Sequence, residues 1–371
     1  MDVPGIPSPR PFSSLLAHFR QLRLRFLRVP SQLQGEVTPP EIRPAAVGLL
    51  GLYKHHNYDQ FWELATEMMS NEKTPGVMLG LLGTLGRVAG NDPERVVGQL
   101  RAAIERGLPE TSRSEMARTL VQILTGLYVV RGDAHVGEQV ERFETEPVRY
   151  AGEVGDEVFT ASYYLVPKNA TPDVRARARE LLRRVLLTSY EQLRRATSIT
   201  EPKERSDALM AAMRHVDEVA SRIYLSLDVK PEQRGPETEL AEEQRRALYF
   251  ELKPLIGLVA QRDQEMGDHH LLPRTAQYVL EILNAVLRYD PTSVITLAGH
   301  VARAGSALGY QFDAMAIREI VQLVEQSLAD HRETLKDPGA ASALGEILDV
   351  FVRASWSEAL QLTFRLDQAV R

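Results

Sequence analysis

The chain has 371 residues, and its 44% hydrophobic and 25% charged content is that of an ordinary globular protein, not of a disordered chain or a collagen. Because it contains no cysteine, it has no disulfide framework, no thiolate nucleophile and no cysteine-ligated zinc or iron–sulfur site. The net charge of -6 argues against a wholly basic nucleic-acid-binding protein, although local cationic patches remain open.

The basic residues are skewed toward arginine, with 37 arginines and seven lysines, as in many proteins from GC-rich bacterial genomes. No run of about 18 apolar residues exists, so the sequence predicts no transmembrane helix. The first residues, Met1–Gly5, lack the basic-then-apolar order of a secretory signal. A cytoplasmic location is therefore the default expectation.

Residues 1–40 are predicted to form a basic amphipathic helix followed by a linker. Phe12, Leu15, Phe19, Leu22 and Phe26 follow the three-and-four spacing of one helix face. Cationic side chains lie mostly opposite that face, at His18, Arg20, Arg23, Arg25 and Arg28. The simplest interpretation is a terminal helix that caps the next helices with its apolar face. Docking on a partner protein and lying on an anionic membrane are the alternatives.

Residues 41–228 are predicted to form an N-terminal helical-repeat region, because helix starts and stops recur along the chain. A capping oxygen precedes a proline, which suits the first helical position, at Thr74, Asp92, Thr171, Asp290 and Asp337. Gly107, Gly132 and Gly305 follow periodic segments as candidate C-terminal caps. These signals divide the whole chain into about a dozen helices joined by short turns. Only the segment from Val148 to Val166 leaves helix and strand both open.

Sequence motifs for nucleotide binding and serine catalysis are missing. The chain has neither a Gly-Lys-Ser nor a Gly-Lys-Thr triplet, and no Gly-x-Ser-x-Gly elbow. The glycines at 76, 80, 83, 86 and 90 lie in one apolar helical run with no preceding strand. We interpret them as positions where two helices approach closely, and His55-His56 as a helix C-terminal cap. No catalytic residue and no cofactor-binding residue is nominated.

A second cationic feature lies between residues 175 and 195. Seven arginines outnumber Asp173, Glu180 and Glu191 there, at positions 175, 177, 179, 183, 184, 194 and 195, which leaves a local balance of +4. Such a helix could follow the phosphate backbone of a nucleic acid. Only one aromatic residue, Tyr190, lies among them, which is no interleaved series to stack on bases, so a solvated outer face is the simpler interpretation.

Residues 229–236 are predicted to be a hinge or linker, because Lys230-Pro231 and Gly235-Pro236 bound a polar stretch between two helical patterns. Residues 237–371 then form a C-terminal helical-repeat region, in which Pro254 should kink or end its helix.

Asp268-His269-His270 is the most metal-like cluster in the chain. The same three letters name the DHH phosphoesterases, but the strand and the further aspartate motifs of that family are missing. A solvated loop between helices is favoured, and no metal ligand is nominated.

Two helix starts look like copies of each other. Asp92-Pro93 leads through Val96 to Gly107, and Asp290-Pro291 leads through Val294 to Gly305. Helical pairs of this kind cannot bury both faces alone, so they stack. The sequence therefore predicts an all-α fold, an irregular HEAT-like α-solenoid of stacked helical pairs. Two compact helical bundles are the alternative.

The C-terminal part resembles a known family. Its successive segments are Asp290–Gly305, Gly309-Tyr310, Ala314–Leu328, Leu344–Val352 and Trp356–Leu360. This progression looks like the helical C-terminal arms of large bacterial NTPases of the STAND/NACHT kind, many of which act in antiviral defence. The resemblance covers about the last 90 residues and includes no NTPase motif. It implies a sensor or scaffold segment that contacts a ligand protein, with Phe351, Trp356 and Phe364 as core or interface aromatics.

The sequence thus predicts a non-enzymatic protein-interaction scaffold or sensor module of a bacterial defence or signalling complex, without a cofactor. The expected partner is another protein, a subunit of a larger complex. The candidate partner-binding residues are Arg20, Arg23, Arg25, Arg28, Arg175, Arg179, Arg183, Arg184 and Trp356. The alternatives are a helical nucleic-acid-binding subunit that uses the Arg175–Arg195 face, and a metal-dependent hydrolase that uses Asp268, His269 and His270.

Overall fold

The computed structural model describes residues 58–71, 75–88, 92, 94–96, 98–99, 113–132, 156–229, 240–260, 273–307, 314–353 and 357–370. Every regular element in these ranges is a helix, so the predicted all-α fold is confirmed. The solenoid arrangement stays a prediction. The chain divides into two compact units, Met1–Arg87 and Val88–Arg371, and each is described by itself.

The first unit contains α3 (Tyr58–Asn71) and α4, which begins at Pro75 and ends at Val88. Phe61, Trp62, Ala65 and Met69 recur at three-and-four spacing on α3, and all four are buried. The rings of Phe61 and Trp62 meet edge to face with centroids 5.3 Å apart. On α4, the buried side chains are Val77, Met78, Leu81, Leu82, Thr84, Leu85 and Val88.

The glycines of α4 do not all serve the close helix approach that the sequence suggested. Gly83 is exposed, and a Cβ atom added there would meet nothing within 4 Å. At this position the prediction is wrong, because the glycine lies on the outer face of the helix.

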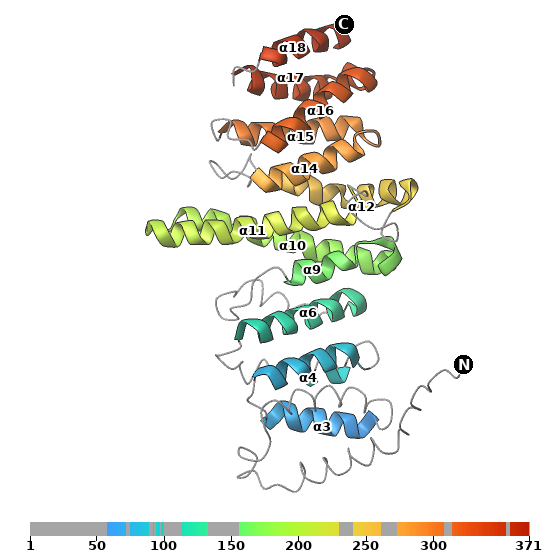
Figure 1. Cartoon of the computed structure of the whole chain (residues 1–371), viewed down its shortest axis with the longest axis vertical. Coiled ribbons are helices and arrows are strands. Elements are labelled where there is room, and N and C mark those ends of the chain that lie inside the picture. The colour runs from blue at the N-terminus through green and yellow to red at the C-terminus, as the bar shows by residue number, and fades with distance from the viewer. Residues whose placement is uncertain are drawn as a thin grey trace, which may run out of the picture. The chain divides into compact units, whose positions relative to one another are not determined.

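The second unit carries most of the helices, which Figure 1 shows following one another from α6 to α18. They are α6 (Arg113–Arg131), α9 (Asp156–Tyr163), α10 (Pro172–Thr197), α11 (Pro202–Ser226), α12 (Glu242–Ala260), α14 (Pro273–Val286), α15 (Pro291–Ala307), α16 (Ala314–Asp330), α17 (Pro338–Arg353) and α18 (Ser357–Val370). Short 3-10 turns occupy Pro167–Asn169 and Thr334–Lys336. The segment Val148–Val166, where strand remained open, is helical over Asp156–Tyr163.

At two predicted helix starts the structure shows the capping hydrogen bond itself. Asp337 Oδ1 accepts a hydrogen bond from the backbone N–H of Ala340 at 2.9 Å, and Asp290 Oδ1 accepts one from Ser293 at 3.4 Å. Thr171 precedes Pro172 at the start of α10, but its side chain makes no capping hydrogen bond. Gly132 ends α6 with a φ of 69°, the left-handed conformation that glycine tolerates.

One prediction about helix ends is wrong, and at Pro254 the structure excludes one of two predicted outcomes and leaves the kink as a prediction. α15 continues through Gly305 to Ala307, so Gly305 is not its cap. α12 continues past Pro254 to Ala260, so the proline does not end the helix. Tertiary packing on the far side of Pro254 explains this, because Leu255, Ile256 and Val259 are all buried.

Neighbouring helices of the second unit pack in two layers. In the first layer α10 contacts α12, α12 contacts α15, and α15 contacts α17. In the second layer α9 contacts α11, α11 contacts α14, and α14 contacts α16. The layers meet through pairs such as α10 with α11 and α14 with α15. The buried apolar side chains of both layers form the core between them.

Of the predicted hinge at 229–236, only residue 229 falls within the described part of the chain. The helices on either side, α11 and α12, are in contact. Buried Asp228, just before the predicted hinge, adopts a φ of 52° and accepts a hydrogen bond from the backbone N–H of Leu240 at 3.3 Å. Arg245 on α12 donates to the carbonyl of Leu227 at 3.2 Å. The ends of this connection are therefore tied together.

In the described ranges, no helix has both the length and the continuous apolar character needed to cross a bilayer.

Candidate interaction surfaces

The arginines of α10 do not form the single cationic face that the sequence suggested. Arg175 grips Glu251 of α12 with both ends of its guanidinium, through Nε to Oε2 at 3.0 Å and Nη2 to Oε1 at 2.8 Å. Arg179 donates to the same carboxylate. The hydrogen bond from Arg175 and the charges of both arginines hold the pKa of Glu251 below its usual range, against the effect of burial. These two candidate residues tie α10 to α12.

Arg177 and Arg184 point toward α6 instead. Arg177 donates to the carbonyl oxygens of Val129 at 2.7 Å and Val130 at 2.9 Å, in the last turn of α6, where a cationic side chain is favourable. The guanidinium of Arg184 lies 5.2 Å from the ring centre of Tyr128, a cation–π distance. Its Nε and Nη2 atoms are buried without a hydrogen-bond partner.

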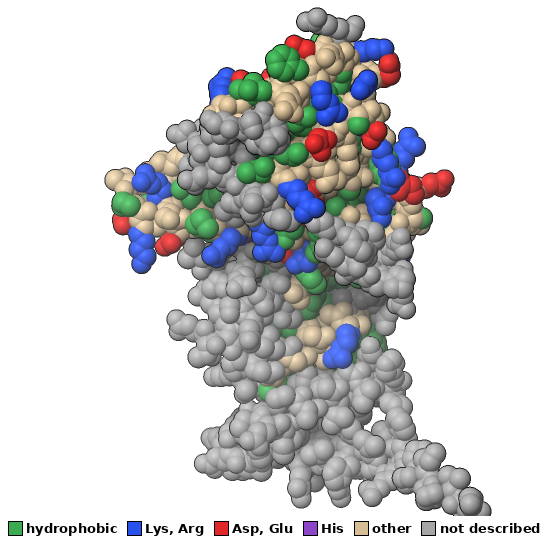
Figure 2. Space-filling view, turned by 45° about the horizontal axis from the view of Figure 1, so that its top comes forward, with side chains coloured by type: hydrophobic (Ala, Val, Ile, Leu, Met, Phe, Trp, Pro, Cys, Tyr) green, Lys and Arg blue, Asp and Glu red, His purple; other side chains and the backbone are tan. Residues whose placement is uncertain are grey.

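Only the remaining arginines of the set face outward. Arg183 pairs with Glu180 at 3.3 Å, and Arg194 and Arg195 both pair with Glu191. Each of these pairs lies within one or two turns of α10 and is largely exposed. Across the described face that Figure 2 shows, blue cationic side chains are interspersed with red acidic ones. The face that could follow a phosphate backbone is therefore divided among internal ties and neutralised pairs.

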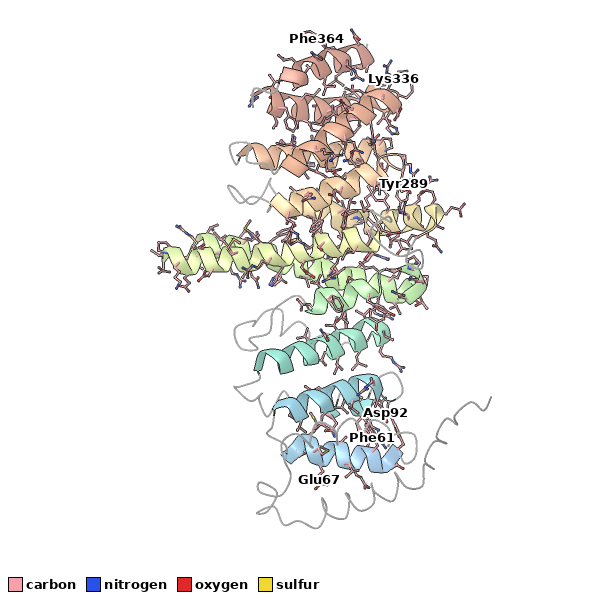
Figure 3. All side chains as sticks on the ribbon, viewed as in Figure 1. Phe61, Glu67, Asp92, Tyr289, Lys336 and Phe364 are labelled. Carbon is pink, nitrogen blue, oxygen red and sulfur yellow. The ribbon has the colours of Figure 1, made fainter. Side chains whose placement is uncertain are left out.

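Several predicted residues lie outside the described part of the chain. These are Arg20, Arg23, Arg25, Arg28, His55, His56, Asp268, His269, His270 and Trp356. Of the aromatics near Trp356, Phe351 is buried, whereas Phe364 on α18 is 69% exposed (Figure 3). Leu360, one turn before Phe364, is also exposed.

The sequence did not predict an exposed aromatic surface that the structure shows on α9 and α11. Phe159 and Tyr163 lie one turn apart on α9 and are 51% and 59% exposed. The guanidinium of Arg222 on α11 lies 4.8 Å from the centre of the Phe159 ring. Leu225, one turn after Arg222, is exposed too. We call these four residues the α9–α11 patch.

The local structure holds this patch in place. Arg222 forms an ion pair with Glu218, one turn earlier on α11, at 2.5 Å, which fixes the guanidinium over Phe159. Tyr163 ends α9, and its carbonyl oxygen accepts a hydrogen bond from the side chain of Asn169 at 2.8 Å. The ring of Tyr163 meets that of Tyr164 edge to face with centroids 5.2 Å apart. The patch is thus a fixed set of aromatic, aliphatic and cationic groups.

The sequence carried one weak signal for the patch. Phe159 and Tyr163 stand at helical spacing in the segment where helix and strand were both open, so the face they share was not defined. Arg222 lies 63 residues further along the chain, and only the contact between α9 and α11 brings it to Phe159.

A polar cluster at the start of α15 also brings together residues of catalytic type. Lys253 Nζ lies 2.6 Å from Asp290 Oδ2 and 2.8 Å from Ser293 Oγ, and the hydroxyl of Tyr249 donates to Asp290 at 3.2 Å. Burial raises the pKa of Asp290, but hydrogen bonds from Lys253 and Ser293 outweigh it and lower the pKa overall. Lys253 donates to both neighbours. The cluster ties α12 to α15 and caps the helix.

Within the described ranges, no three histidine, aspartate or glutamate side chains gather closely enough to hold a metal ion. No protein-family model matches the chain, and no curated protein matches its sequence. The candidate function therefore depends on the surfaces themselves.

Proposed function

We propose that this chain is a non-enzymatic helical scaffold that binds another protein, a subunit of a larger complex, through the α9–α11 patch. The observation that carries the proposal is the pair of exposed aromatic side chains on α9 beside the fixed guanidinium of Arg222. The likeness of the C-terminal segment to the arms of STAND/NACHT proteins supports a role in a bacterial defence or signalling complex.

The chemistry of the patch is that of a protein interface. Tyrosine, phenylalanine and arginine are enriched at the centres of interfaces, where a few such residues carry most of the binding free energy. Rigid aromatic side chains lose little conformational entropy on binding. Because Glu218 already pairs with Arg222, the patch presents a nearly neutral surface. It suits an apolar partner face with hydrogen-bond acceptors near Arg222, in preference to a strongly acidic one.

The engagement of the α10 arginines weighs against the nucleic-acid alternative. A protein that follows a phosphate backbone needs cations that are free to replace counterions. Arg175 and Arg179 are committed to Glu251, and Arg177 is committed to the end of α6. No contact of the described residues favours that function over protein binding.

The proposal is tested by affinity capture of the full chain from cells that naturally express it, read by quantitative mass spectrometry. Wild type is expected to enrich one protein at stoichiometric level. The double variant Phe159→Ala/Tyr163→Ala should lose that protein by at least tenfold, because truncating interface anchors typically costs about 2 kcal/mol each. Phe364→Ala, at an equally exposed ring on α18, is the matched control and should retain it. An empty capture, or equal capture by the double variant, would overturn the proposal.

A further inference from the structure

The two layers of the second unit are fastened by different kinds of contact. In the first layer every neighbouring pair of helices is joined by an ion pair. Arg175 and Arg179 on α10 meet Glu251 on α12, Lys253 on α12 meets Asp290 at the start of α15, and Arg303 on α15 meets Glu346 on α17. We call α10, α12, α15 and α17 the ion-pair layer.

In the second layer the links that the structure shows join unlike groups. On the α9 side, Arg222 lies over the ring of Phe159. Between α11 and α14, Asp217 accepts a hydrogen bond from the hydroxyl of Thr275 at 2.8 Å, and the Tyr224 and Tyr278 rings lie 5.2 Å apart. Arg274, whose charge also acts on Asp217, donates to the Tyr278 hydroxyl at 2.8 Å.

Between α14 and α16, the contact is made by the side-chain amide of Asn284. The side-chain nitrogen of Asn284 donates to both the carbonyl and the carboxylate of Glu319, at 2.8 and 2.7 Å. Glu319 is buried. Apart from the charge of Arg274 on Asp217, these links depend on hydrogen bonds between a neutral donor and a carboxylate or carbonyl, and on ring packing, with apolar burial around them.

Salt acts on these two kinds of contact to different extents. Raising the ionic strength from 0.1 to 1 M shortens the Debye length from about 10 Å to about 3 Å. The first-layer pairs differ in exposure: Lys253, Arg303 and Glu346 are about 40% exposed and open to this screening. Arg175, Arg179 and Glu251 are 13%, 25% and 28% exposed, so the link between α10 and α12 is screened less. Ring packing and hydrogen bonds from neutral donors lose little.

We propose that the second unit is a salt-responsive flexing element, in which high ionic strength loosens the ion-pair layer while the second layer acts as the fixed side. The helices α10 and α17 then move apart and the second layer keeps its spacing. Two further ion pairs, Arg288 with Glu242 and Arg245 with Asp228, join α12 to residues that follow α14 and α11. They do not link neighbouring helices of the ion-pair layer, so they do not resist the separation of α10 from α17. The inference goes beyond the scaffold function and does not depend on it.

Spin-label distances measure this directly, because the chain has no cysteine and accepts introduced ones without background. One labelled pair reports on the ion-pair layer, at the exposed positions Ala176→Cys on α10 and Ser342→Cys on α17. A second pair reports on the other layer, at Ala211→Cys on α11 and Gln322→Cys on α16. Three helix-to-helix steps separate α10 from α17, roughly 25–30 Å at ordinary interaxial distances. The full chain is measured by pulsed dipolar spectroscopy at 0.1 and 1 M salt.

The expected result is a longer and broader α10–α17 distance at high salt, with an unchanged α11–α16 distance. The variant Glu251→Gln/Glu346→Gln removes the links at two of the three steps and leaves Lys253 with Asp290, so it should show a longer distance already at low salt and a smaller salt response. Glu180→Gln removes an ion pair that lies within α10, and this matched control should respond like wild type. Equal responses of both layers, no response, or a double-variant response as large as that of wild type would each overturn the proposal. Circular dichroism checks that every variant keeps its helical content.

Discussion

At the scale of single residues, the structure separates arginines that bind within the fold from aromatic residues that face outward. Arg175 and Arg179 were predicted from their local charge to contact a partner, but both donate to Glu251 on another helix. Phe159 and Tyr163 are exposed although they are large and apolar. Exposed aromatic residues gathered in one place mark interaction sites more often than exposed charges do.

His215 on α11 gives a pH dependence whose sign follows from its burial. Desolvation lowers the pKa of His215 to about 4 in the folded chain, whereas an unfolded histidine titrates near 6.5. The unfolded state therefore binds more protons between these values. The stability from neutral His215 is complete above about pH 6.5 and is lost as the pH falls toward 4.

We expect the free energy of unfolding to fall by about 2 kcal/mol between pH 7 and pH 5 because of His215 alone. His215→Leu should remove that part of the pH dependence, as measured by urea unfolding at both pH values. Val219→Ala, at a buried apolar position one turn further along α11, serves as the control and should keep the wild-type slope. If His215→Leu has the same slope as wild type, His215 is not the cause.

At the scale of elements, the sequence predicted helix starts well because a cap depends on only four or five consecutive residues. Asp290 and Asp337 illustrate this, since each accepts from the N–H three residues later. It left open whether Pro254 kinks or ends α12, and it did not predict that Glu251 receives two arginines from some 70 residues earlier in the chain. Contacts of that range depend on how helices stack, and helical periodicity alone does not carry that information.

The cap of α15 can be separated from its ion pair by two substitutions. Asp290→Ala removes the cap and leaves Lys253 without its carboxylate, and we expect a loss of about 1–2 kcal/mol in the free energy of unfolding. Asp290→Asn keeps a good capping side chain and removes only the charge, so its loss should be clearly smaller. Chemical denaturation at neutral pH compares the two. Equal losses would show that the ion pair, and not the cap, dominates.

Substitution by alanine should change the stability of the chain in opposite directions at Gly83 in α4 and at Gly132, which follows the last residue of α6. Gly83→Ala fills an open position on the outside of α4 and should stabilise the chain by about 0.5–1 kcal/mol. Gly132→Ala forces a Cβ into the left-handed conformation and within 3.3 Å of the Arg177 side chain, and should destabilise by about 1 kcal/mol or more. Thermal unfolding midpoints shifting in opposite directions would support both assignments. A stabilising Gly132→Ala would contradict the C-terminal cap of α6.

At the scale of the whole molecule, composition and periodicity sufficed to predict an all-α chain, because 3.6-residue patterns are local and recur throughout. They did not predict which helix faces remain uncovered. The exposure of Phe159 depends on the short length of α9 and on where α11 crosses it, and Leu360 and Phe364 depend likewise on the packing of α18. Which side chains remain exposed depends on how the helices pack against one another, and local sequence patterns do not contain that information.

Photo-crosslinking in cells is the most direct test of whether the chain binds another protein through the α9–α11 patch. A photoreactive phenylalanine analogue replaces Tyr163 in the full chain, and the control chain carries it at Phe364 instead. Both positions are exposed aromatic sites, so reactivity in solution is matched. We expect one discrete protein adduct from position 163 and none of that identity from position 364. No adduct at 163, an adduct to nucleic acid, or the same adducts from both positions would contradict it.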